Sequence, residues 1–191
     1  MTSQPQPLTT SHAGVMPAAH YAAPSLIKPL FLILMGTLLL TCSSRIMLPI
    51  GPVPATMQTC AVLLIGALYG ARLGALTILT YFAEALSGLP VLAGGLSGFL
   101  CFLGPTGGYL AGFLFSVLLV GWLADNGSIK TGTGAFFTML AGHTVILFSG
   151  FIWLGTLITW KKAALLGVMP FLTVDFFKSL FIAATVRLIR K

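Results

Sequence analysis

Charged side chains are scarce in this sequence, and acidic ones are almost absent. Asp, Glu, Lys and Arg make up 7% of its 191 residues, and three residues in the whole chain are acidic. A soluble domain carries roughly a quarter charged residues, so this chain could not cover a surface that faces water. Because 57% of its residues are hydrophobic, we expect an integral membrane protein with no separate soluble domain.

The sequence also lacks the patterns of a metal site, a disulfide framework and a nucleic-acid-binding surface. Cys42, Cys60 and Cys101 lie far apart inside apolar stretches, in an odd number and without metal-ligand spacing. The net charge is +7, but the basic residues stand at the ends of apolar segments, where the positive-inside rule places them. We therefore expect no metal, no cofactor and no nucleic acid partner.

Six apolar segments follow a tail, residues 1–25, whose Pro, Gln, Ser, Thr and Ala predict disorder. About 20 residues cross the hydrocarbon core as a helix, so residues 26–191 have room for about six spans. We predict a single all-α domain, a compact bundle of six transmembrane helices. The predicted helices are 30–44, 57–69, 73–86, 109–124, 135–160 and 170–189.

The distribution of Lys and Arg predicts the orientation of this bundle. With a cytoplasmic N-terminus, six basic residues lie on the inner side and three on the outer side. We expect the chain to lie in the cytoplasmic (inner) membrane, and this imbalance predicts that both of its termini face the cytoplasm. The inner residues are Lys28, Arg72, Lys130, Arg187, Arg190 and Lys191, and the outer ones are Arg45, Lys161 and Lys162. The connections 45–56, 87–108 and 161–169 would then face outward and hold the binding site.

A pair of oppositely charged residues falls well inside the sixth predicted helix, away from Arg187 near its end. Asp175 and Lys178 are three residues apart and share one helical face, and each costs roughly 2.5–3.5 kcal/mol near the bilayer centre. That cost indicates a polar site, in which the carboxylate accepts from N–H groups of a solute and the ammonium donates to a carbonyl or carboxylate. A structural ion pair is the alternative. Glu84, inside the third helix, is predicted either to pair with Arg45 or Arg72 or to line the same cavity.

The connection between the third and fourth predicted helices is unusually rich in glycine. Glycine permits positive φ and close approach of backbone to a ligand, and non-helical backbone at membrane depth must be buried or line a cavity. We expect this outward loop to fold over the site, with a tight interhelical connector as the alternative. It lacks the Lys-Ser/Thr ending and the preceding strand of a P-loop.

A second function has a weaker pattern in the same loop. Gly95-Leu96-Ser97-Gly98, with His143 in the fifth helix, is typical of a rhomboid-type intramembrane serine protease. A nucleophilic serine needs a base within hydrogen-bond reach, and nothing in the sequence brings these two side chains together. A hydrogen-bonded core histidine is the plainer interpretation of His143.

Several stretches in order resemble the BioY family of biotin transporters, the substrate-binding S-components of energy-coupling factor (ECF) transporters. They are 51–59, 66–70, 88–91, 93–95, 104–109, and Pro170 with Asp175-x-x-Lys178, and they cover nearly all of the chain after about residue 26. Two departures stand out. Thr37 and Thr41 are the nearest match to the small-residue pattern with which the family's first helix docks the coupling protein, and Ala85 stands where relatives often have glycine.

The resemblance implies a six-helix S-component that captures biotin from outside and is not an enzyme. Its implied partners are biotin, membrane lipid, a transmembrane coupling protein and two ATPase subunits. The family's Asp-x-x-Lys pair contacts the biotin head group, and this role carries over onto the matching residues here. The predicted substrate-binding residues are Gln58, Tyr81, Glu84, Gly94, Gly95, Thr106, Tyr109, Asp175 and Lys178.

Two alternatives to biotin capture stay open beside the protease. One is an S-component for another vitamin, and the other is a purely structural membrane protein, which the cost of inserting the charged pair disfavours. The basic residue that would meet the biotin carboxylate is also open, with Arg45, Lys161 and Lys162 as candidates at the outer mouth.

Overall fold

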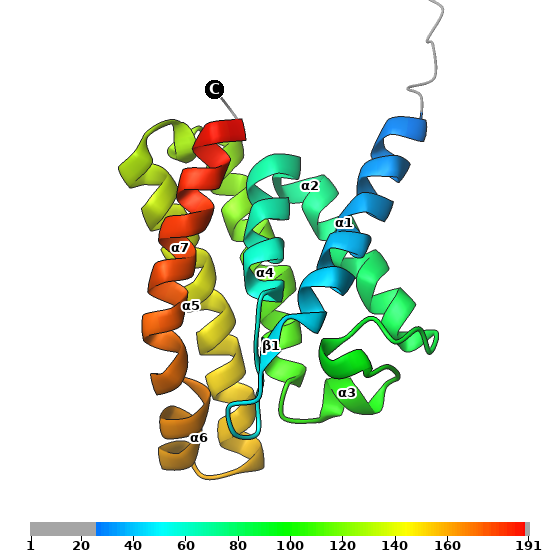
Figure 1. Cartoon of the computed structure of the whole chain (residues 1–191), viewed down its shortest axis with the longest axis vertical. Helices are drawn as coiled ribbons and strands as arrows, with labels where there is room; N and C mark the ends of the chain where they lie inside the picture. Colours follow the sequence, from blue (N-terminus) through cyan, green and yellow to red (C-terminus); the bar gives the residue numbers. More distant parts are fainter. Residues whose placement is uncertain (1–25, 190–191) are drawn as a thin grey trace, which may run out of the picture.

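The computed structural model describes residues 26–189, so the predicted tail and the last two residues lie outside the described part. The described chain is mostly helical and has one antiparallel ribbon of two strands, each two residues long (Figure 1). The elements are α1 (Ile27–Arg45), β1 (Met47–Leu48), β2 (Ala55–Thr56), α2 (Gln58–Leu86), α3 (Leu100–Leu103), α4 (Gly107–Asp125), α5 (Gly132–Leu157), α6 (Trp160–Gly167) and α7 (Met169–Ile189).

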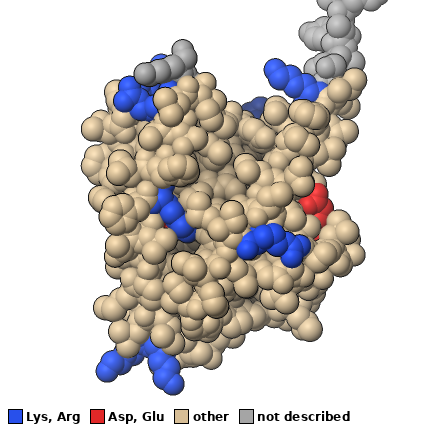
Figure 2. All heavy atoms as spheres, viewed as in Figure 1, with Lys and Arg blue, Asp and Glu red and all other residues tan. Residues whose placement is uncertain are grey.

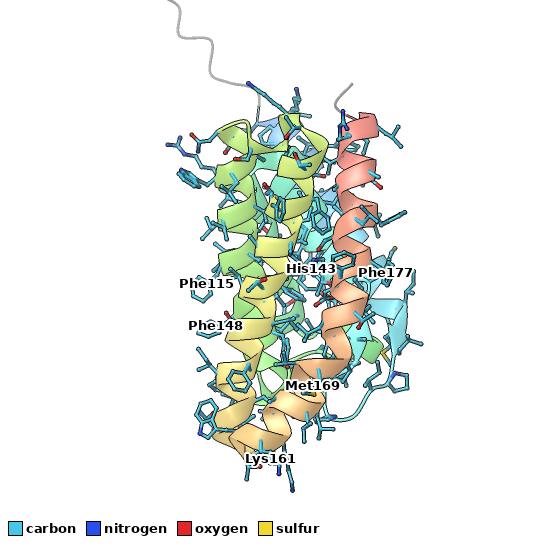
Figure 3. The ribbon with its side chains drawn as sticks, turned by 90° about the vertical axis from the view of Figure 1, so that its left-hand side faces the viewer. Phe115, His143, Phe148, Lys161, Met169 and Phe177 are labelled. Atoms are coloured by element: carbon cyan, nitrogen blue, oxygen red, sulfur yellow. The ribbon has the colours of Figure 1, made fainter. Side chains whose placement is uncertain are left out.

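Within residues 26–189, five helical stretches are long and apolar enough to cross a membrane: α1, α2, α4, α5 and the run from α6 through α7. Their outer faces carry large apolar side chains, and Phe115, Phe148 and Phe177 point away from the bundle in Figure 3 with more than half of their surface exposed. Lys and Arg lie mainly at the two ends of the molecule (Figure 2). A surface this apolar suits lipid, which confirms the predicted multi-pass membrane protein.

The long helix α2 is in fact two helices that meet at Gly70. The φ of 78° and ψ of 178° at this glycine are not helical. A Cβ added to Gly74 would lie 3.7 Å from the Cα of Gly66, although residues eight apart in a straight helix are about 12 Å apart. The chain therefore turns back at Gly70, at the predicted boundary between the second and third helices.

Asp125, in the last turn of α4, explains why the turn takes a glycine. Its Oδ2 accepts a hydrogen bond of 3.2 Å from the backbone nitrogen of Ala71, which satisfies one free donor at the start of the returning helix. A Cβ on Gly70 would lie 2.6 Å from the other carboxylate oxygen. Positive φ and this close carboxylate both exclude a larger residue.

The connections sort to the two ends of the bundle (Figure 1). The turn at Gly70, the turn at Gly127 and the described ends of α1 and α7 lie at one end, drawn at the top. The opposite end, which we call the loop end, holds the β1–β2 ribbon, the segment 87–106 with α3, and α6. This is the grouping that the sequence predicted for three of its connections.

The structure differs from the prediction at 161–169, which forms α6 rather than an irregular connection. Thr159 caps this helix by accepting a 3.4 Å hydrogen bond from the backbone nitrogen of Lys162. The ring of Trp160 then packs edge-on against Phe151 of α5, with ring centroids 5.6 Å apart. A local cap and a contact with a neighbouring helix together stabilise a turn too short to be recognised by its apolar pattern.

The small-residue pair on α1 does not form a free docking surface. Thr37 is 4% exposed, and a Cβ on the adjacent Gly36 would lie 2.5 Å from the methyl group of Thr77. The hydroxyl groups of Thr37 and Thr41 donate to carbonyl groups of α1 itself. This face packs on the returning half of α2, so Thr37 takes part in a close contact between helices of this chain.

Candidate functional site

A cavity of about 370 Å³ lies inside the loop end. Its wall is mostly apolar and comes from parts of the chain far apart in sequence: the ribbon connection, the start of α2, the segment 92–106, and one face each of α4, α5 and α7. A cavity of this size with a few polar groups is typical of small-molecule sites. The polar or charged wall residues are Thr56, Gln58, Thr59, Thr106, Tyr109, Asp175 and Lys178.

Asp175 and Lys178 meet in this wall as the sequence predicts. Oδ1 of Asp175 lies 3.6 Å from Nζ of Lys178, and Asp175 is six residues after the start of α7, about 9 Å along its axis. The ammonium donates hydrogen bonds to the carbonyl of Thr56 at 2.7 Å and to Oγ1 of Thr59 at 3.1 Å. An ammonium has three donors, so one remains for a ligand or for the carboxylate.

His143 of α5 lies on the other side of Asp175, and Figure 3 shows it between α5 and α7. Its Nδ1 is 2.8 Å from the hydroxyl of Ser179, and that hydroxyl donates at 2.7 Å to the backbone carbonyl of Asp175. Since the single hydroxyl proton is used there, Ser179 accepts from His143 and Nδ1 carries the hydrogen. Nε2 then faces Oδ1 of Asp175 at 3.7 Å, and neither atom has a hydrogen-bond partner.

A second polar chain links Gln58 on the wall to the glycine-rich segment. The side-chain nitrogen of Gln58 donates to the hydroxyl of Tyr81 at 2.6 Å, and that hydroxyl donates to the carbonyl of Val91 at 2.7 Å. All three residues are buried. Tyr81 therefore orients the wall residue Gln58 and anchors the segment that closes the cavity.

The model of the BioY family matches residues 9–191, which is nearly the whole chain. The chain belongs to the BioY family. It is 37% identical over 155 residues to the biotin transporter BioY2 of Lactococcus lactis subsp. cremoris (strain MG1363), covering 80% of this chain and 85% of that one. It is 36% identical over 152 residues to a probable biotin transporter BioY of Pyrococcus horikoshii, covering 80% and 90% of the two chains.

A solved structure supports the same family assignment. The S-component for biotin from an ECF-type ABC transporter, whose crystal structure was determined at 2.1 Å, superposes with a TM-score of 0.78 and 29% sequence identity. The match covers 86% of this chain and 92% of that chain. The fold described above is therefore that of a BioY-family S-component.

Five of the nine residues predicted from the BioY resemblance line the cavity: Gln58, Thr106, Tyr109, Asp175 and Lys178. Tyr109 contributes its ring rather than its hydroxyl, because the hydroxyl donates to the carbonyl of Gly167 at 2.8 Å. Its ring centroid lies 6.3 Å from that of Phe171, also on the wall. The hydroxyl of Thr106 has only a long, 3.4 Å hydrogen bond to the carbonyl of Cys101.

The other four predicted residues, Tyr81, Glu84, Gly94 and Gly95, are not placed on the cavity wall. Tyr81 stands behind Gln58. Gly95 is packed against Arg45, whose guanidinium also donates to the carbonyl of Pro90. Arg45 therefore holds the glycine-rich segment in place and does not face the cavity. Glu84 is half-buried, and the described part of the chain shows no ion pair between it and Arg45 or Arg72.

The basic residues proposed for the outer mouth are also absent from the wall. Arg45 lies against the glycine-rich segment, and Lys161 and Lys162 are exposed on α6. Of the residues that the structure describes, Lys178 is the one Lys or Arg that lines the cavity.

The protease pair is not assembled. One ring nitrogen of His143 contacts Ser179 and the other faces Asp175, so no nitrogen of the ring is directed to Ser97. The residues that sequence reasoning missed are Thr56, Thr59 and Ser179. Ser179 is one helical turn after Asp175 and could have been noticed from its spacing, whereas Thr56 and Thr59 are 122 and 119 positions from Lys178.

Proposed function

We propose that this BioY-family protein captures biotin in the loop-end cavity and takes it across the membrane as the substrate-binding component of an ECF transporter. The observation that supports this most directly is the ion pair of the buried Asp175 and the part-buried Lys178 in a mostly apolar cavity. The choice of biotin as the ligand rests on the names of the relatives and of the structural neighbour.

The chemistry of biotin suits this wall. Its ureido ring has two N–H donors and one carbonyl acceptor, which the carboxylate of Asp175 and the remaining donor of Lys178 can answer. Its thioether ring and pentanoate chain are largely apolar and would pack against Phe113, Ile146 and Leu147. Hydrogen bonds to charged partners are each worth about 1.5–3 kcal/mol, so this pair would supply a large share of the specificity.

Equilibrium binding of labelled biotin to the detergent-purified full chain tests the proposal. We expect tight binding that Asp175→Asn weakens strongly, while unlabelled thiamine and riboflavin do not compete. Displacement of labelled biotin by thiamine or riboflavin at lower concentrations than by unlabelled biotin would assign the cavity to a different S-component substrate. Absence of biotin binding by a well-folded sample would contradict the proposal.

We further propose that the six predicted helices, which correspond to α1, the two halves of α2, α4, α5 and α7, all cross the cytoplasmic membrane. Both termini would lie in the cytoplasm, and the glycine-rich segment between α2 and α4 would face out. Lys28, Lys130 and Arg187 lie at the end of the bundle where the described part of α1 begins and that of α7 ends. The positive-inside rule expects such residues on the inner face. In a cysteine-free background, a membrane-impermeant thiol reagent on intact cells should label Lys161→Cys and not Lys130→Cys. The reverse pattern would invert the orientation.

The binding unit is proposed to be residues 26–191, without a contribution from the tail. Among residues 26–189, which the structure describes, those that line the cavity all lie after residue 51. Deleting residues 2–25 should therefore leave biotin affinity within about twofold of that of the full chain. A loss of affinity with normal folding would assign a role to the tail.

The energising partners are proposed to be a transmembrane coupling protein and two ATPase subunits. The structural neighbour is an S-component of an ECF-type ABC transporter, and the sequence has no P-loop of its own. Uptake of labelled biotin by cells that lack their own biotin transporter should rise when the partner subunits are co-expressed with this chain. Equal uptake without them would indicate that the chain acts alone.

A further inference from the structure

Two buried hydrogen-bond acceptors face each other beside the cavity. Nε2 of His143 and Oδ1 of Asp175 are 3.7 Å apart, and neither has a hydrogen-bond partner. His143 is 1% exposed and Asp175 is 4% exposed. A buried acceptor without a hydrogen bond is costly, and Oδ1 has in addition only the 3.6 Å contact with the ammonium of Lys178. A donor placed between Nε2 and Oδ1 would stabilise both atoms.

The hydrogen-bond pattern shows what is missing. Ser179 uses its proton on the carbonyl of Asp175, which leaves it as the acceptor of the Nδ1 proton of His143. The neutral imidazole then has a bare Nε2, and that nitrogen points at a carboxylate. One proton between Nε2 and Oδ1 would satisfy both atoms after a movement of less than about 1 Å, since N–H···O bonds are about 2.7–3.2 Å long.

The charge of the ligand gives a reason for this site. Asp175 and Lys178 neutralise each other, and of the described residues no other Lys or Arg lines the wall. The carboxylate of biotin would add one uncompensated negative charge, which is costly in a buried, apolar site. His143 and Asp175, whose Nε2 and Oδ1 face each other at 3.7 Å, can together hold one proton that compensates this charge.

We propose that His143 and Asp175 form a proton-binding site, and that an anionic ligand enters the cavity together with one proton held between Nε2 and Oδ1. This inference rests on the proposed capture of biotin. The complex then holds one more proton than the empty protein, so biotin affinity rises as pH falls. No bond other than the N–H or O–H bond to that proton is formed or broken.

The other titratable groups near this site are Lys178 on α7, Cys60 on α2 and Tyr109 on α4, each of which acts electrostatically on it. The hydroxyl of Tyr109 is committed to Gly167 and the ammonium of Lys178 to Thr56 and Thr59. His12 and His20 lie outside the described residues. These groups define the controls.

The test is a count of protons taken up when biotin binds to the detergent-purified full chain, from titration calorimetry in buffers of different ionisation enthalpy. Carboxylic acids titrate near pH 4 to 5, so across about pH 6 to 8 biotin is an anion throughout. We expect uptake of about one proton per biotin, and affinity that changes by up to about tenfold per pH unit. Biotin binding without proton uptake would overturn this inference and leave the proposed function standing, whereas absence of biotin binding would overturn both.

Variants and a neutral ligand locate the proton. His143→Gln should bind biotin without proton uptake, whereas Cys60→Ala and the double variant His12→Gln, His20→Gln should keep the uptake of the wild type. The wild type should also take up no proton with biotin amide, which lacks the charge. This last comparison needs no folded variant. Uptake that persists in His143→Gln, or that is equal for biotin and its amide, would contradict the proposal.

Discussion

The ammonium of Lys178 donates a 2.7 Å hydrogen bond to the backbone carbonyl of Thr56, a residue 122 positions earlier in the chain. With the 3.1 Å bond to Thr59, it ties α7 to the start of α2 at the cavity wall. The same ammonium lies 3.6 Å from Asp175. One side chain therefore joins two helices and also carries the positive charge of the proposed site.

Removal of either member of the charged pair should weaken biotin binding. Lys178→Met and Asp175→Asn should each cost at least about 2 kcal/mol, roughly 30-fold in Kd, because each removes a charge-assisted hydrogen bond and leaves its partner buried without a counter-charge. Equilibrium binding to purified protein measures the change. Lys162→Met, on the exposed α6, is the matched control and should bind normally. Near-wild-type affinity in both wall variants would remove the pair from the site.

Tyr81→Phe should lower both stability and affinity, although Tyr81 is not on the cavity wall. The variant loses the hydroxyl that accepts from Gln58 and donates to Val91, which leaves buried polar groups unpaired at about 1–3 kcal/mol. Thermal unfolding in detergent and biotin binding report the two effects. Tyr69→Phe serves as the control, since its ring is half-buried and its hydroxyl makes no hydrogen bond to another residue within 26–189. Equal behaviour of the two variants would contradict the role given to Tyr81.

Tyr109→Phe should separate the ring from the hydroxyl. The ring lines the cavity while the hydroxyl donates to the carbonyl of Gly167. Loss of that single hydrogen bond should lower the free energy of unfolding by about 1 kcal/mol and leave Kd within about threefold of the wild-type value. Tyr109→Ala, which also removes the ring, should weaken binding much further. A large loss of affinity in Tyr109→Phe would mean that the hydroxyl meets the ligand.

Gly70→Ala should destabilise the fold more than Gly88→Ala. Both glycines have positive φ, 78° and 94°, so both substitutions carry the backbone strain of about 1–3 kcal/mol. At Gly70 the added methyl group also meets Asp125 at 2.6 Å, whereas nothing lies within 4 Å of a Cβ on Gly88. Thermal unfolding of the two variants should show a lower Tm for Gly70→Ala. A lower Tm for Gly88→Ala would contradict the account of this turn.

Ser97→Ala should leave biotin binding unchanged. Ser97 is in the glycine-rich segment, and the ring nitrogens of His143 are directed to Ser179 and Asp175 instead. A serine-directed fluorophosphonate probe should likewise fail to label the wild type. Labelling that Ser97→Ala abolishes would revive the protease hypothesis.

Most helices were predictable because their signal is local. Runs of apolar residues with few charges identified the helices to within about three residues at most ends. Gly70 was predicted to lie in the turn between the second and third helices, and its backbone is indeed not helical. The short α6 was not predictable in this way. It depends on a cap at Thr159 and on the packing of Trp160 against Phe151, and the second of these is a tertiary contact.

The residues of the site likewise differ in how far the sequence predicts them. The cost of placing charge in a membrane was enough to select Asp175 and Lys178 from the sequence. The same reasoning left Glu84 either paired with an arginine or on the cavity wall, and among the described residues the structure shows neither arrangement. Membrane depth alone does not tell which face of a helix a side chain occupies.

The amino-acid sequence by itself determined that this is a helical membrane protein with a charged pair in its last helix, because hydropathy, helical spacing and family motifs are properties of the chain. Only the tertiary structure decided which groups surround that pair. Thr56 and Thr59 reach Lys178, and His143 reaches Asp175 and Ser179, across the contacts that α7 makes with the start of α2 and with α5. Contacts between residues so far apart depend on how the helices pack, and no local pattern encodes that packing.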